Sequence, residues 1–348
     1  MKKYPKTFKY KSWHDRRVRK IGKTPQRNKK YNPNKVAIHK RANPEFIEAD
    51  PVVAPVNICL LSKTNDCLRF FTELRQEKSI SKIGRNCFVQ IDLSKVKKFD
   101  YSSICVLIAI IEDLNSDNIN LRGNYPNDEL SKKQIIESGL LTFMHDDKGN
   151  RFQKSEKSDM LFIEKGAKVL KRKDNESISN TIKHVVKHLT KEEKHLPKLK
   201  RILLKICGNS IEWGGTKNQQ WLFGVKYEDD KVIFTVTDVG KGILKTLNKK
   251  FKDTLKDMFT LKKYDDILKD AFIKKYGSST HKVNRNKGLP SIKNAFDEGV
   301  INNLKVLTND VILHYGEDKD SEILTKTHFK GTLYCWELTS ETIKEATD

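Results

Sequence analysis

An aspartate that ends an apolar strand pattern is the first residue whose position suggests chemistry. Val232–Thr237 reads as a strand and runs directly into Asp238, Gly240 and Gly242 in the pattern Asp-x-Gly-x-Gly. A carboxylate at a strand end can accept a hydrogen bond from an amino group of a ligand, and the glycines let the backbone approach that ligand closely. The pattern indicates a recognition site, although by itself it fits a simple turn equally well.

Further residues occur around this motif in a more specific order. Asn209 lies ahead of it, on a predicted helix over Leu199–Glu212. Three short glycine-containing segments follow it: Gly277–Thr280, Asn286–Leu289 and the start of a last strand at Gly331-Thr332. The ordered set, over residues 195–340, resembles the GHKL ATPases, which include gyrase, heat-shock chaperones, mismatch-repair proteins, histidine kinases and anti-sigma serine kinases.

The resemblance implies a Bergerat-type ATP-binding fold, with ATP and Mg²⁺ as cofactors and residues 244–287 as a lid. Asn209 would help to hold Mg²⁺ on the triphosphate, because an amide oxygen suits a hard cation. Asp238 would bind the adenine amino group, while Gly240 and Gly242 would shape the nucleotide wall. Thr332 would support the aspartate from the neighbouring strand. Four more residues would lie at the phosphate end: Ser279, Thr280, Gly288 and Leu289.

Two departures from the family pattern bear on turnover. Relatives that hydrolyse ATP or phosphorylate serine have a glutamate one helical turn before the asparagine, where this chain has Lys205. A protonated lysine cannot act as a base, and Glu212, three residues after the asparagine, is the candidate catalytic substitute. Asn286 stands where a lid glycine is usual, and asparagine is the next best tolerated residue at positive φ. We therefore expect nucleotide binding with slow or conditional turnover.

A serine pair at a predicted helix start is the second candidate site. The buried-strand pattern Cys87–Leu93 precedes Ser102-Ser103 and an apolar helix over Tyr101–Leu114. Together with the later Ser138-Gly139-Leu140, these segments of residues 52–150 resemble a STAS domain, the module of anti-sigma-factor antagonists and sulphate-transporter tails. The resemblance implies that Ser102 matches a serine phosphorylated by a partner kinase, at a helix N-terminus that favours phosphate. The alternative is that both serines simply cap the helix.

The elements that position these residues alternate between strands and helices, which predicts a layered α/β sandwich. In the first module we expect a strand over Val56–Leu61, a helix through Gln76 with Asn65 as its N-cap, a strand over Ile119–Leu121 and a helix over Asp128–Ser138 capped by Gly139. In the second, a hairpin joins Trp221–Tyr227 to the strand before Asp238. The predicted organisation is a basic arm at 1–50, the STAS-like domain at 52–150, a connector at 151–194, the GHKL domain at 195–340 and a tail at 341–348.

The connector pattern is polar, with a strand over Met160–Glu164 and a helix over Ser177–Leu189. His184 and His188 share a face of that helix, but no third ligand follows at a fitting distance, so we expect a packing or surface role. Six scattered cysteines without a Cys-x-x-Cys pair fit free thiols in a reducing compartment. No apolar run could span a bilayer and no secretory pattern is present, so a cytoplasmic protein without a structural metal or a membrane partner is expected.

The first 44 residues hold sixteen Lys and Arg against one acid, Asp15, within a whole-chain net charge of +23. This segment has four prolines and no apolar period, so it cannot bury a core by itself. Aromatic residues lie among the cations, a composition that suits phosphate neutralisation and base stacking. A solvated tail, or an arm that packs on an acidic protein partner, fits the same composition.

Two functions of different classes follow. The leading one is an intracellular Mg-ATP-binding regulatory switch, in which the GHKL module phosphorylates Ser102 or the STAS-like module is a scaffold for a protein partner or a homodimer. The alternative is a nucleic-acid-associated effector, for example in bacterial defence, whose arm binds DNA or RNA while ATP sets the conformation. A histidine kinase is disfavoured, since neither a phosphoacceptor helix nor a sensor membrane segment is found.

Overall fold

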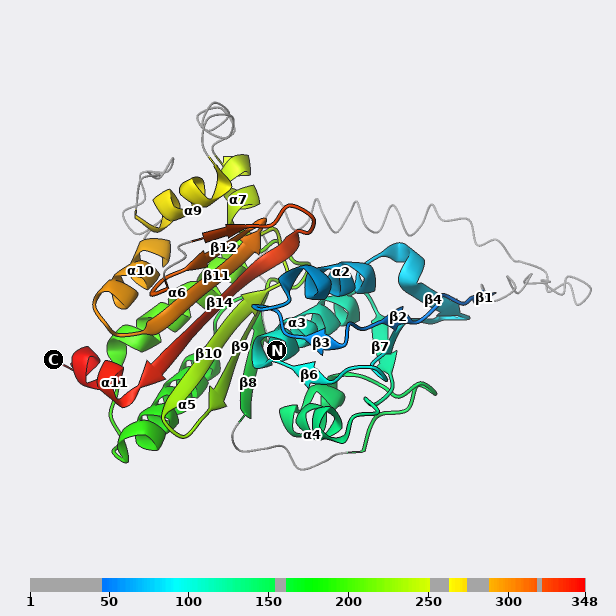
Figure 1. The fold of residues 1–348 in the computed structure, drawn as a ribbon, viewed down its shortest axis with the longest axis horizontal. Helices are drawn as coiled ribbons and strands as arrows, with labels where there is room; N and C mark the ends of the chain where they lie inside the picture. Colours follow the sequence, from blue (N-terminus) through cyan, green and yellow to red (C-terminus); the bar gives the residue numbers. More distant parts are fainter. Residues whose placement is uncertain (1–45, 154–160, 251–262, 274–287, 318–320, 348) are drawn as a thin grey trace, which may run out of the picture. The chain divides into compact units, whose positions relative to one another are not determined.

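The computed structural model describes residues 46–153, 161–250, 263–273, 288–317 and 321–347. Strands of two main sheets form its frame, and helices lie against both sheets (Figure 1). The mixed α/β class that the sequence predicts is thereby confirmed. None of the helices in these ranges is long and apolar enough to cross a membrane.

The larger sheet has seven strands in the described residues, and every neighbouring pair is antiparallel. The strand order is β13 (Ser321–Ile323), β12 (Val311–His314), β11 (Asn302–Asn309), β14 (Phe329–Thr339), β10 (Lys231–Asp238), β9 (Gln220–Tyr227) and β8 (Leu161–Ala167). The predicted hairpin of β9 and β10 is present. Strand β14, the last in the sequence, lies in the middle of the sheet and is hydrogen-bonded to both β10 and β11.

One face of this sheet packs against four helices, which are α5 (Arg172–Thr190), α6 (Pro197–Trp213), α9 (Tyr264–Phe272) and α10 (Gly288–Asp297). Side chains alternate between the two faces of a strand, so the even-numbered residues of β10 enter the core beneath these helices, as Val232, Phe234 and Val236 do. Asp238 is the next even position. The aspartate is therefore directed to the helix-covered face.

From residue 161 onward, the described part of the segment expected as a connector packs with this C-terminal module, and so does the expected tail. β8 pairs with β9 along its whole length, and α5 buries Ile178, Ile182 and Val185 in the same core. Helix α11 (Ser340–Thr347) buries Ile343 there as well. Both helices carry many charged residues on their exposed faces, so their composition resembles that of a linker even though one face of each is apolar and buried.

The N-terminal module is built around β5 (Asn86–Asp92). β4 (Ile80–Ile83) pairs antiparallel with β5, and β1 (Phe46–Ile47) pairs with β4. β2 (Val52–Val53) and β7 (Ile119–Gly123) pair parallel with β5, while β3 (Asn57–Ile58) and β6 (Lys98–Phe99) form a separate parallel pair. Its helices are α2 (Thr64–Leu74), α3 (Tyr101–Ser116) and α4 (Glu129–Ser138).

Two local expectations for this module can be checked directly. Gly139 is the C-cap of α4 with φ 74°, as predicted. Asn65 was expected to cap α2, but the helix already begins at Thr64, and the Asn65 side chain instead accepts a 2.6 Å hydrogen bond from the Thr327 hydroxyl. A long-range contact with the C-terminal module therefore replaces the expected local one.

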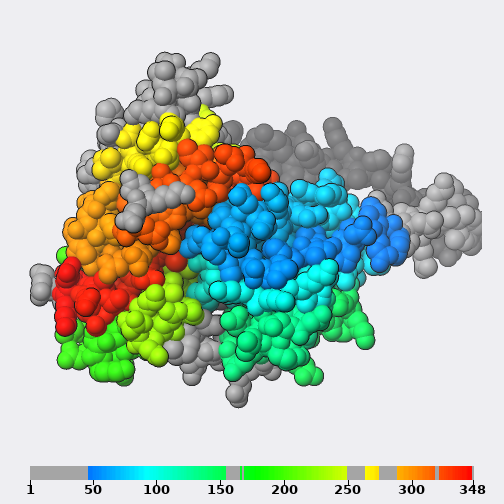
Figure 2. Space-filling view, in the orientation of Figure 1, coloured from blue at the N-terminus to red at the C-terminus, as the bar shows by residue number. Residues whose placement is uncertain are grey.

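Helix α3 is shared between the two modules. Every residue from Tyr101 to Ile111 is buried, which is the behaviour of a helix that is apolar all round. One side lies against β7 and the other against β9 and β10. The core of the N-terminal module consequently continues onto the large sheet at Leu222, Leu307 and Leu333. Figure 2 shows the blue residues of the N-terminal module directly against orange residues of the C-terminal module.

A glycine in β9 permits the close approach of α3. A Cβ atom at Gly224 would lie 2.5 Å from Cys105 Sγ and 2.8 Å from Tyr101 Oη, both on the first turns of α3. These distances are shorter than van der Waals contact, so a side chain at this position would clash with α3. The spacing between helix and sheet therefore depends on the absence of this side chain.

We predict that Gly224→Ala lowers the free energy of unfolding by about 1–3 kcal/mol, because the added methyl group overpacks the interface. Chemical denaturation measures the change. Adding Cys105→Ala, which removes the nearest atom, should recover part of the loss in the double variant. Gly208→Ala in α6 is the matched control, since no other element in the described part of the chain lies within 4 Å of its added Cβ. A Gly224→Ala protein as stable as the wild type would contradict the packing described here.

Candidate functional site at the end of strand β10

The Asp238 carboxylate is buried, with the residue only 6% exposed. Its Oδ1 accepts a 3.0 Å hydrogen bond from the Gly240 backbone N–H, and its Oδ2 accepts one of 3.1 Å from the Ser210 hydroxyl on α6. Burial disfavours the charged form and raises the pKa of Asp238 to about 6. The hydrogen bonds from Gly240 and Ser210, the positive charge of Arg75 and the Thr332 backbone act in the opposite direction.

The loop after Asp238 packs backbone against backbone. A Cβ atom at Gly240 would overlap the carbonyl oxygen of Gly214, just after α6, and the Lys241 N–H donates a 2.6 Å hydrogen bond to that same carbonyl. A Cβ atom at Gly331, where β14 begins, would overlap the Asp238 carbonyl oxygen. Side chains are therefore excluded on both sides of the aspartate, which fixes the carboxylate against α6.

Helix α7 (Ile243–Lys250) leaves this loop, and two side chains from β11 hold its start. Thr308 Oγ1 accepts from the Ile243 N–H and Asn309 Oδ1 accepts from the Leu244 N–H, each at 2.9 Å. The Asn309 amide also donates to the Lys241 carbonyl at 2.8 Å. Gly242 has φ 80°, a conformation that favours glycine. These contacts order the loop between Asp238 and α7.

Helix α6 presents a row of residues to the start of α10. Lys205 Nζ donates a 2.6 Å hydrogen bond to Ser291 Oγ. One turn further, the Asn209 side chain lies against Gly288, where a Cβ atom would be 2.6 Å from Asn209 Nδ2. Among the described residues outside α6, none lies within 4 Å of a Cβ atom added at the neighbouring Gly208. Asn209 and Gly288 are thus brought together where α6 meets the start of α10.

Of the other residues that the sequence predicts for the site, one lies opposite Asp238, two lie elsewhere in the C-terminal module and the rest fall outside the described residues. Thr332 is buried opposite Asp238 on β14, and its Oγ1 is 3.4 Å from Thr308 Oγ1. Leu289 packs against the C-terminal core, and Glu212 is exposed near the end of α6. Ser279 and Thr280, with Asn286 and most of the expected lid, lie outside the described residues.

Ser102 lies on the opposite face of β10 from Ser210. Its hydroxyl is 3.2 Å from Thr235 Oγ1 and donates to Cys335 Sγ at 3.7 Å, and the residue is 5% exposed. Neither serine of the pair is the helix cap: Asp100 is the N-cap of α3 and accepts from the Ser103 N–H at 2.6 Å. Ser103 Oγ instead accepts a hydrogen bond from the Leu60 N–H. Ser102 therefore belongs to the interface between the modules.

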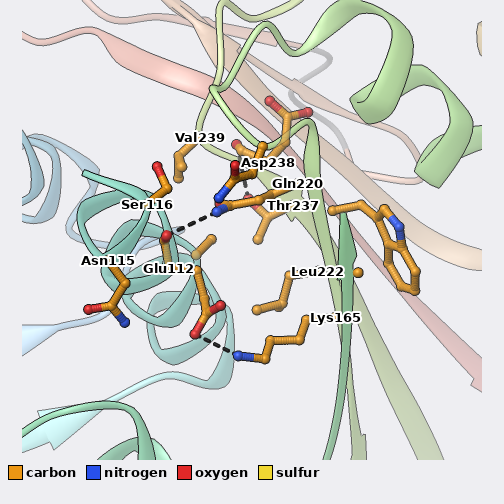
Figure 3. Close-up of a pocket in the computed structure, with 13 residues that line it drawn as sticks. Glu112, Asn115, Ser116, Lys165, Gln220, Leu222, Thr237, Asp238 and Val239 are labelled. Carbon is orange, nitrogen blue, oxygen red and sulfur yellow. Dashed lines mark hydrogen bonds and ion pairs between the residues drawn. The ribbon is translucent and has the colours of Figure 1, made fainter. Parts of the chain in front are cut away.

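A cleft of about 340 Å³ lies on this second face, between α3 and strands β8 to β10 (Figure 3). Glu112 Oε1 on α3 and Lys165 Nζ on β8 form a 2.6 Å ion pair across it. The Gln220 amide donates to the Glu112 backbone carbonyl at 2.9 Å. Because Thr237, Asp238 and Val239 line the cleft, it touches the candidate site from behind.

The arrangement of these side chains suits ligand recognition better than catalysis. Asp238 offers a buried acceptor to an amino group, and Asn209 offers an amide beside the start of α10. In the described residues no three His, Cys, Asp or Glu side chains are grouped to hold a metal ion.

Several residues that build the site were not predicted from the sequence. Ser210 directly follows Asn209 on the predicted helix, so the sequence could have suggested that its side chain also lies near the end of the strand that carries Asp238. Thr308 and Asn309 end an apolar strand far along the chain, and their contact with α7 needs the order of strands in the sheet to be known.

His188, by contrast, has the packing role that was expected. It contacts the Glu228 carbonyl at 2.7 Å and packs edge-on against Tyr227.

Asp238→Asn should make the protein more stable at neutral pH. The folded pKa of about 6 exceeds the ordinary value of 3.8, so ionising Asp238 costs the fold up to about 3 kcal/mol as pH rises from about 4 to about 6. Asparagine cannot ionise, yet it can accept from Gly240 and donate to Ser210. Denaturant unfolding of both proteins at pH 4.5 and 7.5 should show a stability gap that widens toward neutral pH. An equal gap at both pH values would contradict the burial of a titrating carboxyl.

Comparison with known proteins assigns no family to this chain. No protein-family model matches the sequence, and no curated protein matches it. The roles of Asp238, Asn209 and their neighbours therefore rest on the contacts described above.

Proposed function

We propose that this chain is a Mg-ATP-binding regulatory protein, with a GHKL-type nucleotide module and a STAS-like N-terminal module. The observation that carries the proposal is the buried Asp238 carboxylate, held by Ser210 and Gly240 in a loop that excludes side chains. A rigid acceptor of this kind suits the exocyclic amine of adenine. A buried carboxyl with a perturbed pKa is also more typical of a binding site than of a structural turn.

The surroundings of Asn209 support a triphosphate at the other end of the ligand. The side chain abuts Gly288 at the start of α10, where the helix dipole and the N–H groups of a first helical turn favour anions. No described residue outside α6 lies within 4 Å of a Cβ atom added at the neighbouring Gly208. Mg²⁺ bound to the triphosphate would neutralise phosphate charge, and Asn209 would orient that pair relative to α10.

The contacts of Lys205 favour binding over turnover. Its ammonium group donates to Ser291 and has no lone pair with which to accept a proton from water. Transfer of phosphate to Ser102 would require α3 to leave the sheet, because that hydroxyl is buried against Thr235. We therefore propose a protein that holds ATP and releases phosphate slowly or only when a partner rearranges the modules.

Incubation with γ-labelled Mg-ATP tests the nucleotide site. We expect the wild-type protein to retain label as intact ATP, because adenine and triphosphate are both held while Lys205 occupies the position where a base would act. Asp238→Asn should lose that retention while remaining folded, since it presents an amide donor to the adenine amine. Filter binding and chromatography of the bound nucleotide measure both. Equal retention by the two proteins would overturn the assignment of Asp238.

Lys205→Glu tests the assignment of slow turnover. A carboxylate at this position can act as a base, so phosphate release should rise by about 10²-fold or more over the wild type. Lys205→Gln is the matched control, because it also removes the charge-bearing donor to Ser291 without adding a base. An equal rate in both variants would show that the lysine is not what limits hydrolysis.

A nucleic-acid-associated effector is a second candidate, favoured by sixteen cations and interleaved aromatic residues in the first 44 positions. Structurally this arm lies outside the described residues.

If the second candidate is right, affinity for a single-stranded oligonucleotide should fall by about 10³-fold or more between 50 and 200 mM salt, through loss of counterion release. Fluorescence anisotropy measures it, with a protein of residues 45–348 as control. Binding that survives deletion of the arm would contradict the assignment.

A further inference from the structure

One side chain of the N-terminal module reaches the loop that carries Asp238. Arg75 follows the last turn of α2, and its guanidinium forms a 2.7 Å ion pair with Asp113 on α3. The same nitrogen donates a 2.8 Å hydrogen bond to the Val239 carbonyl, and the other terminal nitrogen donates a longer one, 3.4 Å, to the Lys330 carbonyl. Arg75 and Asp113 are each only about one fifth exposed, so water screens this contact weakly.

The two carbonyls that Arg75 contacts flank the candidate site. Val239 separates Asp238 from Gly240, and Lys330 directly precedes Gly331, whose backbone packs against the Asp238 carbonyl. Arg75 therefore holds together the end of β10 and the start of β14. Asp113 fixes the orientation of the guanidinium, because a planar group with two partners has little freedom left.

The guanidinium also acts on Asp238 at a distance. Its positive charge favours the ionised carboxylate, opposing the larger effect of burial. From β14, the buried hydroxyl of Tyr334 also senses the Asp238 charge, and burial raises the pKa of that hydroxyl well above its ordinary value. Ser210 on α6 and the Gly240 N–H supply neutral donors. Arg75 is thus the cation that the N-terminal module contributes to the charge balance of the site.

We propose that Arg75 is a positioning residue for the nucleotide-binding loop, so that docking of the N-terminal module and affinity for ATP are coupled. This inference rests on the proposed function for ATP itself. It assigns a regulatory route: whatever shifts α2 away from β14 removes the support of Val239 and weakens nucleotide binding. By linkage, bound ATP in turn strengthens the docking of α2.

The test compares two variants, Arg75→Met and Arg75→Lys, with the control Arg69→Met. The control removes the same charge from an exposed position on α2, where Arg69 pairs with Asp66 at 3.6 Å. Calorimetry with Mg-ATP at several pH values measures affinity. We expect Arg75→Met to weaken binding about tenfold and to move the acidic loss of binding to higher pH. Arg75→Lys should weaken binding while leaving that pH midpoint in place, because the charge remains. Arg69→Met should change neither.

A second measurement does not need ATP. The N–H groups of Gly240, Lys241, Ile243 and Leu244 are all hydrogen-bonded, so their hydrogen exchange is slow when the loop is held. In Arg75→Met they should exchange faster than in Arg69→Met. Equal exchange and equal ATP affinity in these two variants would overturn the inference. If the wild-type protein binds no ATP, the proposed function fails, and the exchange comparison alone decides whether Arg75 supports the loop.

Discussion

The burial of α3 on both of its sides is the constraint on which the rest of the structure depends. One side completes the core of the N-terminal sheet, and the other covers the face of the large sheet that α5 and α6 leave open. Two modules that read as separate domains therefore share one apolar helix. The lack of a side chain at Gly224 sets the distance between them, and Arg75 and Asn65 make polar contacts around the same boundary.

Features encoded in a short stretch of sequence were predictable. The apolar run of α3, the glycine cap of α4 and the β9–β10 hairpin follow from local patterns, and each is present. The place of β8 and α5 did not follow, because their polar residues dominate composition and their pairing partners lie far along the chain. Asn65 is a similar case, since a capping residue and a long-range hydrogen-bond acceptor look alike in sequence.

The candidate site likewise combines residues that a local pattern predicts with residues that only the folded structure brings together. Asp238 and its glycines are a contiguous motif, so their position at a strand end could be read directly. The support for that motif comes from Ser210, Thr308, Asn309 and Arg75, which approach from three other elements. Ser102 is a further case in which local sequence is not enough. A serine near a helix start suggests a cap or a modification site, whereas its neighbours on the sheet place it in a buried interface.

The central position of β14 has a consequence for how the chain is made. This strand is translated after every other strand of the large sheet, yet it separates β10 from β11 and carries Thr332 opposite Asp238. Until it emerges from the ribosome, β10 has an unpaired edge and Leu333 is missing from the core beneath α3. Contacts this distant in sequence close slowly. The pairing of β10 with its central neighbour and the part of the core that Leu333 fills are therefore completed only when this late segment is added.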